Sequence, residues 1–307
     1  MNFQKYSSLE NAYRDKFTNA CRNVGIKDWV ATVKVHGSNF GFISDGDDLE
    51  PFKRSSTIGK NPETGMYDFY GCNDIVAECT PKVKRLAQVV GKPIQVYGEL
   101  YGQGVQKEIN YGGKKFIMFD ILTDDGWLEW DEVVRLGEQV GIPTVPELAR
   151  GDLEDMLNLP TDFVCPLSPT GDMAEGVVIK PLTEVHTTLS TGSRPIIKNK
   201  SKAFSEKKQK TSKKPFKLPE HIKPIMTDFT AYLTENRLNN VLSKIDLSTL
   251  TQKDFGKVMG MLVQDAKEEF ERDEYEINKD DWKLMTKTVN KEAGQVVRAQ
   301  WLNILDS

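Results

Sequence analysis

The chain has 307 residues, which is long enough for two domains of about 100–200 residues each. Its hydrophobic content of 38% and charged content of 28% are typical of a folded protein and exclude a disordered chain. No apolar stretch approaches the ~18–20 residues of a membrane helix, and the N-terminus lacks the apolar core of a signal peptide. The four cysteines form no Cys-x-x-Cys pair, and three histidines are too few for a typical zinc cage. We therefore predict a soluble, reduced, cytoplasmic protein that binds no membrane.

The net charge of −4 is distributed unevenly along the chain. Residues 1–197 carry a balance of −8 and residues 219–307 a balance of −4, whereas residues 198–217 hold nine lysines and one acid. Charge alone favours a solvated linker for this lysine block. The alternative is a surface for a polyanionic partner, and the motifs described below favour that alternative.

The hydrophobic period changes near residue 205. Before it the period is mostly two, which predicts short strands within residues 28–44, 49–56, 94–100, 115–123, 174–181 and 194–200. Helices are expected at residues 8–24, 72–90 and 130–140. After residue 218 the period is 3.6, which predicts helices at roughly 220–235, 237–245, 252–275 and 280–304. We therefore predict an α+β fold: an antiparallel-sheet domain over residues 1–205, a lysine-rich linker over 206–218 and a small all-α domain over 219–307.

A motif with reactive side chains lies at the end of the first alternating strand. It reads Lys34-Val35-His36-Gly37-Ser38-Asn39. A lysine beside a glycine suits covalent chemistry at a phosphate, because glycine allows a nucleotide to approach the backbone closely. By itself the motif is more typical of a surface lysine at a strand end. Four further segments follow it in a fixed order: Tyr97-Gly98-Glu99, Phe116–Asp120, Glu175–Lys180 and Lys198-Asn199-Lys200.

The order and the amino-acid sequences of these segments resemble the motifs of the covalent nucleotidyltransferases, which include polynucleotide ligases and messenger-RNA capping enzymes. DNA ligases and capping enzymes usually have Asp at the position of His36. A histidine at this position resembles the branch of RNA ligase 2 and the RNA-editing ligases. Further strings resemble the bacteriophage RNA ligase 2 family over nearly the whole chain: KYSSLEN, GVQKEINY, FSEKKQK, NRLNNVLSKI and DFGKVMGMLVQD. The resemblance implies a ligase-type nucleotidyltransferase domain followed by a helical RNA-end-joining domain.

The resemblance also implies an activity. In an ATP-dependent RNA ligase of this kind, Lys34 would attack the α-phosphorus of ATP and form a lysyl-AMP with release of pyrophosphate. AMP would then pass to a 5′-phosphate RNA end, which is sealed to a 3′-OH with release of AMP. The implied cofactors are ATP and Mg²⁺, and the implied substrate is a nicked RNA duplex. We expect a monomer, and a phage origin would place it in the host cytosol, although the sequence leaves a dimer open.

Carried over position by position, the resemblance implies a role for each motif residue. His36 would orient or release pyrophosphate, Glu99 would accept a hydrogen bond from the ribose, and Phe119 would stack on adenine. The full implied nucleotide-binding set is Val33, Lys34, Val35, His36, Asn39, Arg54, Glu99, Phe119, Lys198 and Lys200. Glu175 would serve near the metal and the reacting phosphate. The implied RNA contacts are Arg54, Lys180, Arg237 and Asp265. Val33 departs from the family, which often has Glu there, and leaves adenine recognition at that position to the backbone.

The residue types support these roles on physical grounds. A lysine attacks phosphorus only after losing its proton, and neighbouring cations disfavour its charged form. Lys198 and Lys200 share one face of a strand, so both ammonium groups can reach one phosphate. The alternative is an exposed edge strand protected by lysines. Glu175 and Lys180 are five residues apart and face opposite sides of a regular strand, which makes a bulge or a position at the strand end necessary.

Other interpretations stay open at the level of sequence. Alternation alone favours a core position for Phe119 over a stacking platform, and Arg237 and Asp265 fit a helix–helix or interdomain salt bridge. A GTP-using capping enzyme or a DNA ligase would normally carry an OB-fold barrel, whereas residues 219–307 have helical periodicity. A non-catalytic RNA-binding protein would use the lysine block alone and would take up no covalent label from a nucleotide.

Overall fold

The computed structural model describes residues 1–307 except 184, 206–217, 246, 248–249, 274 and 306–307. The chain divides into two compact units, Met1–Ala203 and Phe204–Ser307, which we call the N-terminal and C-terminal units. Nearly all of the predicted linker, residues 206–218, lies outside the described residues. Within the described part, no helix has the length and apolar character that a membrane span requires.

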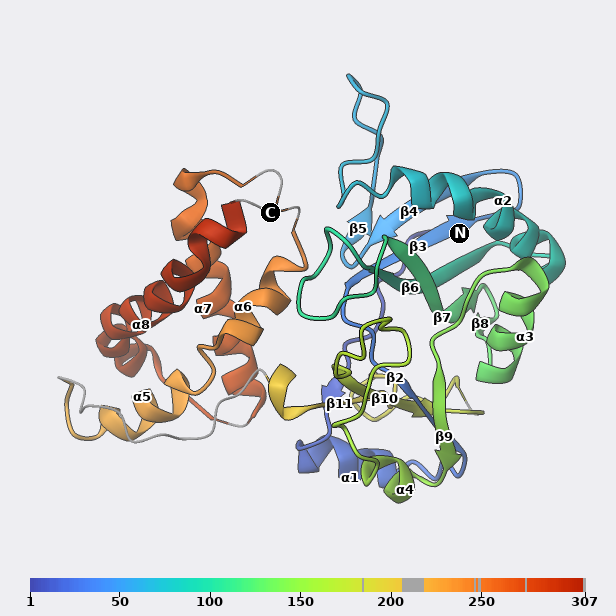
Figure 1. Cartoon of the computed structure of the whole chain (residues 1–307). Helices are drawn as coiled ribbons and strands as arrows, with labels where there is room; N and C mark the ends of the chain where they lie inside the picture. Colours follow the sequence, from blue (N-terminus) through green and yellow to red (C-terminus); the bar gives the residue numbers. More distant parts are fainter. Residues whose placement is uncertain (184, 206–217, 246, 248–249, 274, 306–307) are drawn as a thin grey trace. The chain divides into compact units, whose positions relative to one another are not determined.

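The N-terminal unit is built on two sheets, which confirms the predicted α+β class (Figure 1). One has five strands in the order β1 (Glu10–Asn11), β11 (Ile197–Lys200), β10 (Gly176–Pro181), β2 (Trp29–Val33) and β9 (Glu147–Gly151). The other has six, in the order β5 (Ser56–Thr57), β4 (Leu49–Lys53), β3 (Ser38–Ser44), β6 (Ile94–Tyr101), β7 (Lys115–Thr123) and β8 (Gly126–Trp127). The six-stranded sheet is antiparallel, and in the five-stranded sheet the β1–β11 pair is parallel.

Helices cover the outer faces of both sheets. Helices α1 (Asp15–Asn23) and α4 (Leu153–Leu157) share a core with β2, β10 and β11, and α2 (Asn73–Val90) and α3 (Trp130–Val140) pack on the six-stranded sheet (Figure 1). The inner faces meet around a second core that holds Tyr6, Phe52, Tyr97 and Trp127. The first predicted helix is wrong at its start, because residues 10 and 11 pair with β11 and the helix begins at Asp15.

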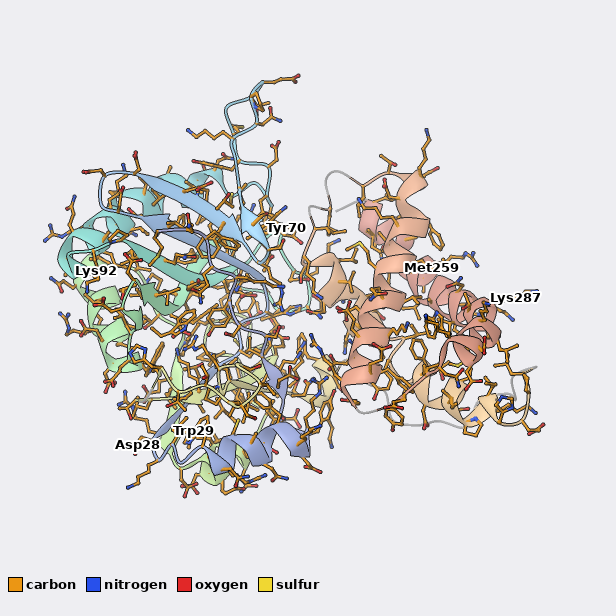
Figure 2. The ribbon with its side chains drawn as sticks, turned by 180° about the vertical axis from the view of Figure 1, so that it is seen from behind. Asp28, Trp29, Tyr70, Lys92, Met259 and Lys287 are labelled. Atoms are coloured by element: carbon orange, nitrogen blue, oxygen red, sulfur yellow. The ribbon has the colours of Figure 1, made fainter. Side chains whose placement is uncertain are left out.

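The C-terminal unit is helical in its described residues, as its period of 3.6 predicts. Its helices are α5 (Ile222–Thr230), α6 (Glu235–Leu242), α7 (Phe255–Arg272) and α8 (Lys279–Leu305). The expected helix 220–235 ends early, because the Thr234 hydroxyl accepts a hydrogen bond from the Arg237 amide and begins α6. Leu238, Leu262 and Val289 are fully buried in its core, whereas Lys287 of α8 is exposed (Figure 2). A short 3₁₀ turn, η3 (Gln252–Asp254), precedes α7, and another, η1 (Lys202–Phe204), follows β11.

Candidate active site

Lys34 lies directly after β2 and next to the start of β10. These strands are antiparallel neighbours with Val33 opposite Val177, and the Lys34 amide donates a hydrogen bond to the Gly176 carbonyl at 2.9 Å. The register therefore sets Lys34 beside Glu175, although 141 residues separate them in the sequence.

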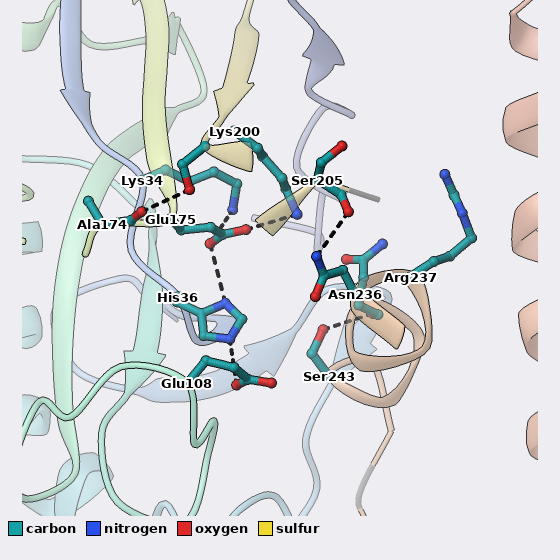
Figure 3. A network of polar contacts seen from close by, with 12 residues as sticks. Lys34, His36, Glu108, Ala174, Glu175, Lys200, Ser205, Asn236, Arg237 and Ser243 are labelled. Carbon is teal, nitrogen blue, oxygen red and sulfur yellow. Dashed lines mark hydrogen bonds and ion pairs between the residues drawn. The ribbon is translucent and has the colours of Figure 1, made fainter. Parts of the chain in front are cut away.

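Glu175 is the centre of a cluster of cations (Figure 3). Its Oε2 accepts from Lys34 Nζ at 2.9 Å, and its Oε1 lies 2.9 Å from Lys200 Nζ. His36 Nδ1 lies 3.4 Å from Oε2, and the carboxylate side chain is 4% exposed. Burial would raise the pKa of Glu175, but Lys200, Lys34 and His36 hold it well below its usual range. The candidate nucleophile and one of the paired downstream lysines therefore share one buried anion.

His36 lies between two carboxylates. In addition to Glu175, its Nε2 is 2.9 Å from Glu108 Oε2, and its backbone amide donates to the Tyr111 hydroxyl at 3.0 Å. Burial would lower the pKa of His36, but the hydrogen bonds to Glu108 and Glu175 raise it above its usual value. Sequence reasoning gave Glu108 no role, because neither periodicity nor motif spacing connects a loop carboxylate to a histidine 72 residues away.

Two glycines of the motifs are required by the protein itself. A Cβ on Gly37 would lie 2.2 Å from the Leu100 carbonyl oxygen of β6. Gly176 has φ of +144°, and a Cβ there would lie 2.1 Å from the Asn199 carbonyl oxygen of β11. Approach of a nucleotide was the expected reason for Gly37, whereas the structure shows that a neighbouring strand already fills that space.

Asn39 and Glu99 are direct cross-strand partners on β3 and β6. The Asn39 Oδ1 atom is buried and has no hydrogen-bond partner in the described structure. Burial raises the pKa of Glu99 to about 7, with a further rise from Glu175 and opposing effects from Lys34, His36 and Arg54. The pair thus offers an unsatisfied oxygen and an acid that ionises near neutral pH, which suits a ligand with hydroxyl or amine donors.

A pH-dependent stability follows from Glu99. Its raised pKa means that the folded chain binds more protons than the unfolded chain between about pH 4.5 and 7. Stability from this group is therefore present below that window and is lost as the pH rises through it. We expect Glu99→Gln to have a melting temperature above that of the wild type at pH 8, with the difference shrinking toward pH 5. Thermal unfolding in chelator at both pH values measures this, and a difference that does not change with pH would contradict it.

Phe119 is the extra residue of a β-bulge. Tyr97 of β6 pairs with Asp120 and Gly98 pairs with Met118, so Phe119 has no partner on β6. The bulge turns Phe119 toward the inner face, where its ring lies 5.0 Å from the Tyr6 ring in an edge arrangement and stays partly exposed. The two expectations for Phe119, core packing and a stacking platform, are therefore compatible with one position.

The remaining nucleotide candidates differ in what they can offer. Lys198 lies opposite Val178, two residues before Lys200, and shares its face of β11, as expected. Arg54 lies in the β4–β5 turn, near enough to lower the pKa of Glu99. Val33 and Val35 are buried, and the Val33 amide already donates to the Pro146 carbonyl. Neither valine side chain is open to a ligand.

Comparison with known proteins agrees with this arrangement. Residues 27–200 match the family model of RNA ligase, and residues 216–295 match the model of the T4 RNA ligase 2 C-terminal domain. The first match covers more than half of the chain and includes Lys34, Glu99, Glu175 and Lys200. This chain belongs to the RNA ligase family.

Individual relatives are distant. The mitochondrial RNA-editing ligase 2 of Trypanosoma brucei brucei is 24% identical over 99% of this chain and 92% of its own length. A solved mutant of the Naegleria gruberi RNA ligase with ATP and Mn has a TM-score of 0.51 and 19% identity, over 66% of this chain and 58% of that chain. The apo structure of another mutant gives 0.50 and 19%, over 66% and 56%. The chain thus spans less than two thirds of these solved ligases, which share its fold.

Lys180 corrects one expectation for this RNA ligase. Its ammonium is buried, and it donates to Asp120 Oδ1 at 2.7 Å and to the Phe119 carbonyl at 2.6 Å. Burial lowers the pKa of Lys180 against the opposing effect of Asp120. A buried ammonium with these partners holds the Phe119 bulge in place and has no surface to offer RNA. The predicted RNA contact at Lys180 is therefore wrong.

Two further residues complete the Asp120 cluster and were missed in the sequence. Arg194 Nη1 donates to Asp120 Oδ2 at 3.0 Å, and the Tyr6 hydroxyl donates to the same oxygen at 2.6 Å. Burial would raise the pKa of Asp120, but Lys180 and Arg194 lower it. Tyr6 stands in KYSSLEN, a string that carries only the resemblance, and Arg194 begins the strand expected at residues 194–200, whose pattern does not indicate an acidic partner on β7.

Arg237 and Asp265 form a salt bridge inside the C-terminal unit. Arg237 Nη1 lies 2.8 Å from Asp265 Oδ2, and Lys244 Nζ lies 2.6 Å from Oδ1. The Arg237 side chain is 1% exposed and also donates to the Tyr232 carbonyl. The RNA contact expected for Arg237 is therefore not available, and the alternative of a salt bridge between α6 and α7 is correct. Asp265 is 19% exposed and serves the same bridge.

Proposed function

We propose that this RNA ligase uses ATP, stores AMP on Lys34 as a lysyl-AMP, transfers it to a 5′-phosphate RNA end and seals that end to a 3′-OH. The observation that carries the proposal is the Glu175 cluster. In this cluster, residues from three separate motifs meet: Lys34 and Lys200 each lie 2.9 Å from an oxygen of Glu175. Such a convergence has no purpose in a protein that only binds RNA.

The cluster suggests how Lys34 is controlled. An amine attacks phosphorus only in its neutral form, and in the structure Glu175 Oε2 accepts a hydrogen bond from Lys34 Nζ at 2.9 Å. Lys200 competes for the same carboxylate from its other oxygen. A triphosphate that enters beside these groups would compete with Glu175 for both lysines. Lys34 would then release a proton to solvent, and its neutral nitrogen would bond to the α-phosphorus as the bond from that phosphorus to the pyrophosphate oxygen breaks. The bonded nitrogen would release a second proton to solvent.

The adenosine half would lie on the six-stranded sheet. The partly exposed Phe119 ring offers a stacking surface for adenine, and Glu99 and the unpartnered Asn39 Oδ1 offer acceptors for ribose or base donors. The Naegleria gruberi ligase solved with ATP and Mn supports ATP as the nucleotide.

The acidic residues of the site fit a divalent cation that takes most of its ligands from water and from the bound phosphates. Within the described residues, no group of three or more His, Cys, Asp or Glu side chains could hold a metal ion. Mg²⁺ commonly takes one or two carboxylates and completes its shell with water and phosphate oxygens. Glu175 would hold it, and the ion would neutralise charge on the phosphates. The RNA substrate, a nicked duplex with 5′-phosphate and 3′-OH ends, and the monomeric state are part of this proposal.

The two units should divide the labour. Every nucleotide candidate lies in Met1–Ala203, which has its own core, so a fragment of these residues should still accept AMP from ATP. It should fail to seal a nicked RNA duplex, because the C-terminal unit and the lysine block are missing. Binding by the full chain should weaken steeply with salt, since each phosphate contact releases a counterion. Labelling and sealing assays on both chains measure this. A fragment that seals as well as the full chain would contradict it.

A further inference from the structure

The loop between β6 and β7 holds His36 at two points. Glu108 Oε2 lies 2.9 Å from the ring atom Nε2, and the Tyr111 hydroxyl accepts the backbone amide of His36. The loop itself is fixed, because the Gln103 amide donates to the Gly112 carbonyl and Ile109 and Tyr111 are buried. One loop thus restrains both the backbone and the side chain of a motif residue on a different segment.

The contact with Glu108 also sets where the ring points. An imidazole has two nitrogens, and a bond at one fixes the direction of the other. With Nε2 on Glu108, Nδ1 lies 3.4 Å from Glu175 Oε2, the oxygen that also accepts from Lys34 (Figure 3). The His36 side chain is 13% exposed and lies between the two carboxylates. A ring flip about the Cβ–Cγ bond would put Cδ2 in the place of Nδ1 and Cε1 in the place of Nε2, so both contacts would be lost.

We propose that Glu108 is a positioning residue, which holds the His36 imidazole with Nδ1 directed at the Glu175 carboxylate beside Lys34. The proposal rests on the proposed AMP transfer to Lys34, and it assigns Glu108 no contact with the reacting atoms. About a third of the Glu108 side chain is exposed (34%), and the buried residues of the loop are its neighbours. The same Oε2 also accepts from the Lys107 amide at 3.1 Å. Loss of the carboxylate should therefore remove the ring contact and one exposed hydrogen bond of the loop, while the buried Ile109 and Tyr111 keep the loop folded.

A double-mutant cycle on self-adenylylation tests the coupling. We expect Glu108→Ala to slow the rate at saturating ATP about 10-fold, the order expected for losing a hydrogen bond to a charged group. The ATP concentration for half-saturation should change by less than about twofold, because the substrate contacts remain. In a His36→Ala background the same change should have almost no further effect. Equal slowing in both backgrounds would overturn the proposal.

Two variants separate positioning from damage to the loop. Glu108→Gln keeps an oxygen that can accept from the ring, so its rate should lie nearer the wild type than that of Glu108→Ala. Lys107→Ala shortens the adjacent side chain of the same loop and should leave the rate within about twofold of the wild type. A Glu108→Gln rate as slow as that of Glu108→Ala, or an equal loss in Lys107→Ala, would show that the contact with the ring does not matter.

The contact can also be measured without nucleotide. The chain has three histidines, so ¹⁵N ring signals can be assigned with His36→Ala. At one fixed pH, Glu108→Ala should shift the His36 signals and leave those of His186 and His221 unchanged. Unchanged His36 signals would overturn the positioning role whatever the activity. A shift in a chain that never takes up AMP would support the positioning role and refute the proposed AMP transfer instead.

Discussion

Replacing Lys34 with alanine is expected to abolish covalent labelling of the chain by α-labelled ATP. The physical reason is that no other amine in the described site has the same position, directly after β2 and 2.9 Å from Glu175. The label on the wild-type chain should survive denaturation, because a covalent bond joins AMP to the lysine in a lysyl-AMP. A denaturing gel after incubation with ATP and Mg²⁺ measures the loss.

The matched control is Lys82→Ala, which removes a partly exposed lysine of α2 and should label as the wild type does. A strand that already carries AMP on its 5′ end bypasses Lys34, so Lys34→Ala should still seal it if the variant is folded. Wild-type labelling of Lys34→Ala would refute the nucleophile assignment. A preference for label from GTP would favour capping chemistry over RNA ligation.

Replacing Lys180 with alanine is expected to destabilise the N-terminal unit by about 3–5 kcal/mol, the cost of breaking a buried ion pair. Lys180 donates to Asp120 and to the Phe119 carbonyl, and its Nζ lies 4.4 Å from the Trp130 ring centre. The variant leaves the buried carbonyl without this donor and leaves Asp120 to Arg194 and Tyr6.

Urea unfolding of Met1–Ala203, followed by tryptophan fluorescence, measures the change in the free energy of unfolding. The control is Lys92→Ala, which removes a partly exposed lysine paired with Asp125 and should cost less than about 1 kcal/mol. Equal losses in the two variants would show that the Asp120 cluster contributes no more than a surface pair.

The sequence predicts the fold class well, because hydrophobic period is a local property. The bounds expected for the helix at residues 130–140 are those of α3, and the strand expected at 115–123 is β7. Hydrophobic periods do not predict secondary structure correctly where pairing with a distant strand determines it. Residues 10 and 11 leave their expected helix to pair with β11, and β9 at Glu147–Gly151 is held by β2 without a strong pattern of its own.

Some residues of the candidate site could likewise be predicted from the sequence, and others could not. Motif order identifies Lys34, Glu175 and Lys200, which the antiparallel register then brings together. Glu108 could not be found, because its contact with His36 depends on the path of a loop. Lys180 was misassigned for a related reason: a lysine at the end of a motif can face either solvent or a buried acid, and the acid belongs to another strand, β7.

The central claim is that the amine of Lys34 carries AMP. Mapping the AMP adduct by mass spectrometry, after the intact chain is incubated with ATP and Mg²⁺ and digested, tests it most directly. We predict one adduct, on the peptide that contains Lys34, and none when a chelator is present. An adduct on Lys198 or Lys200 with Lys34 unmodified, or none under any condition, would contradict the claim.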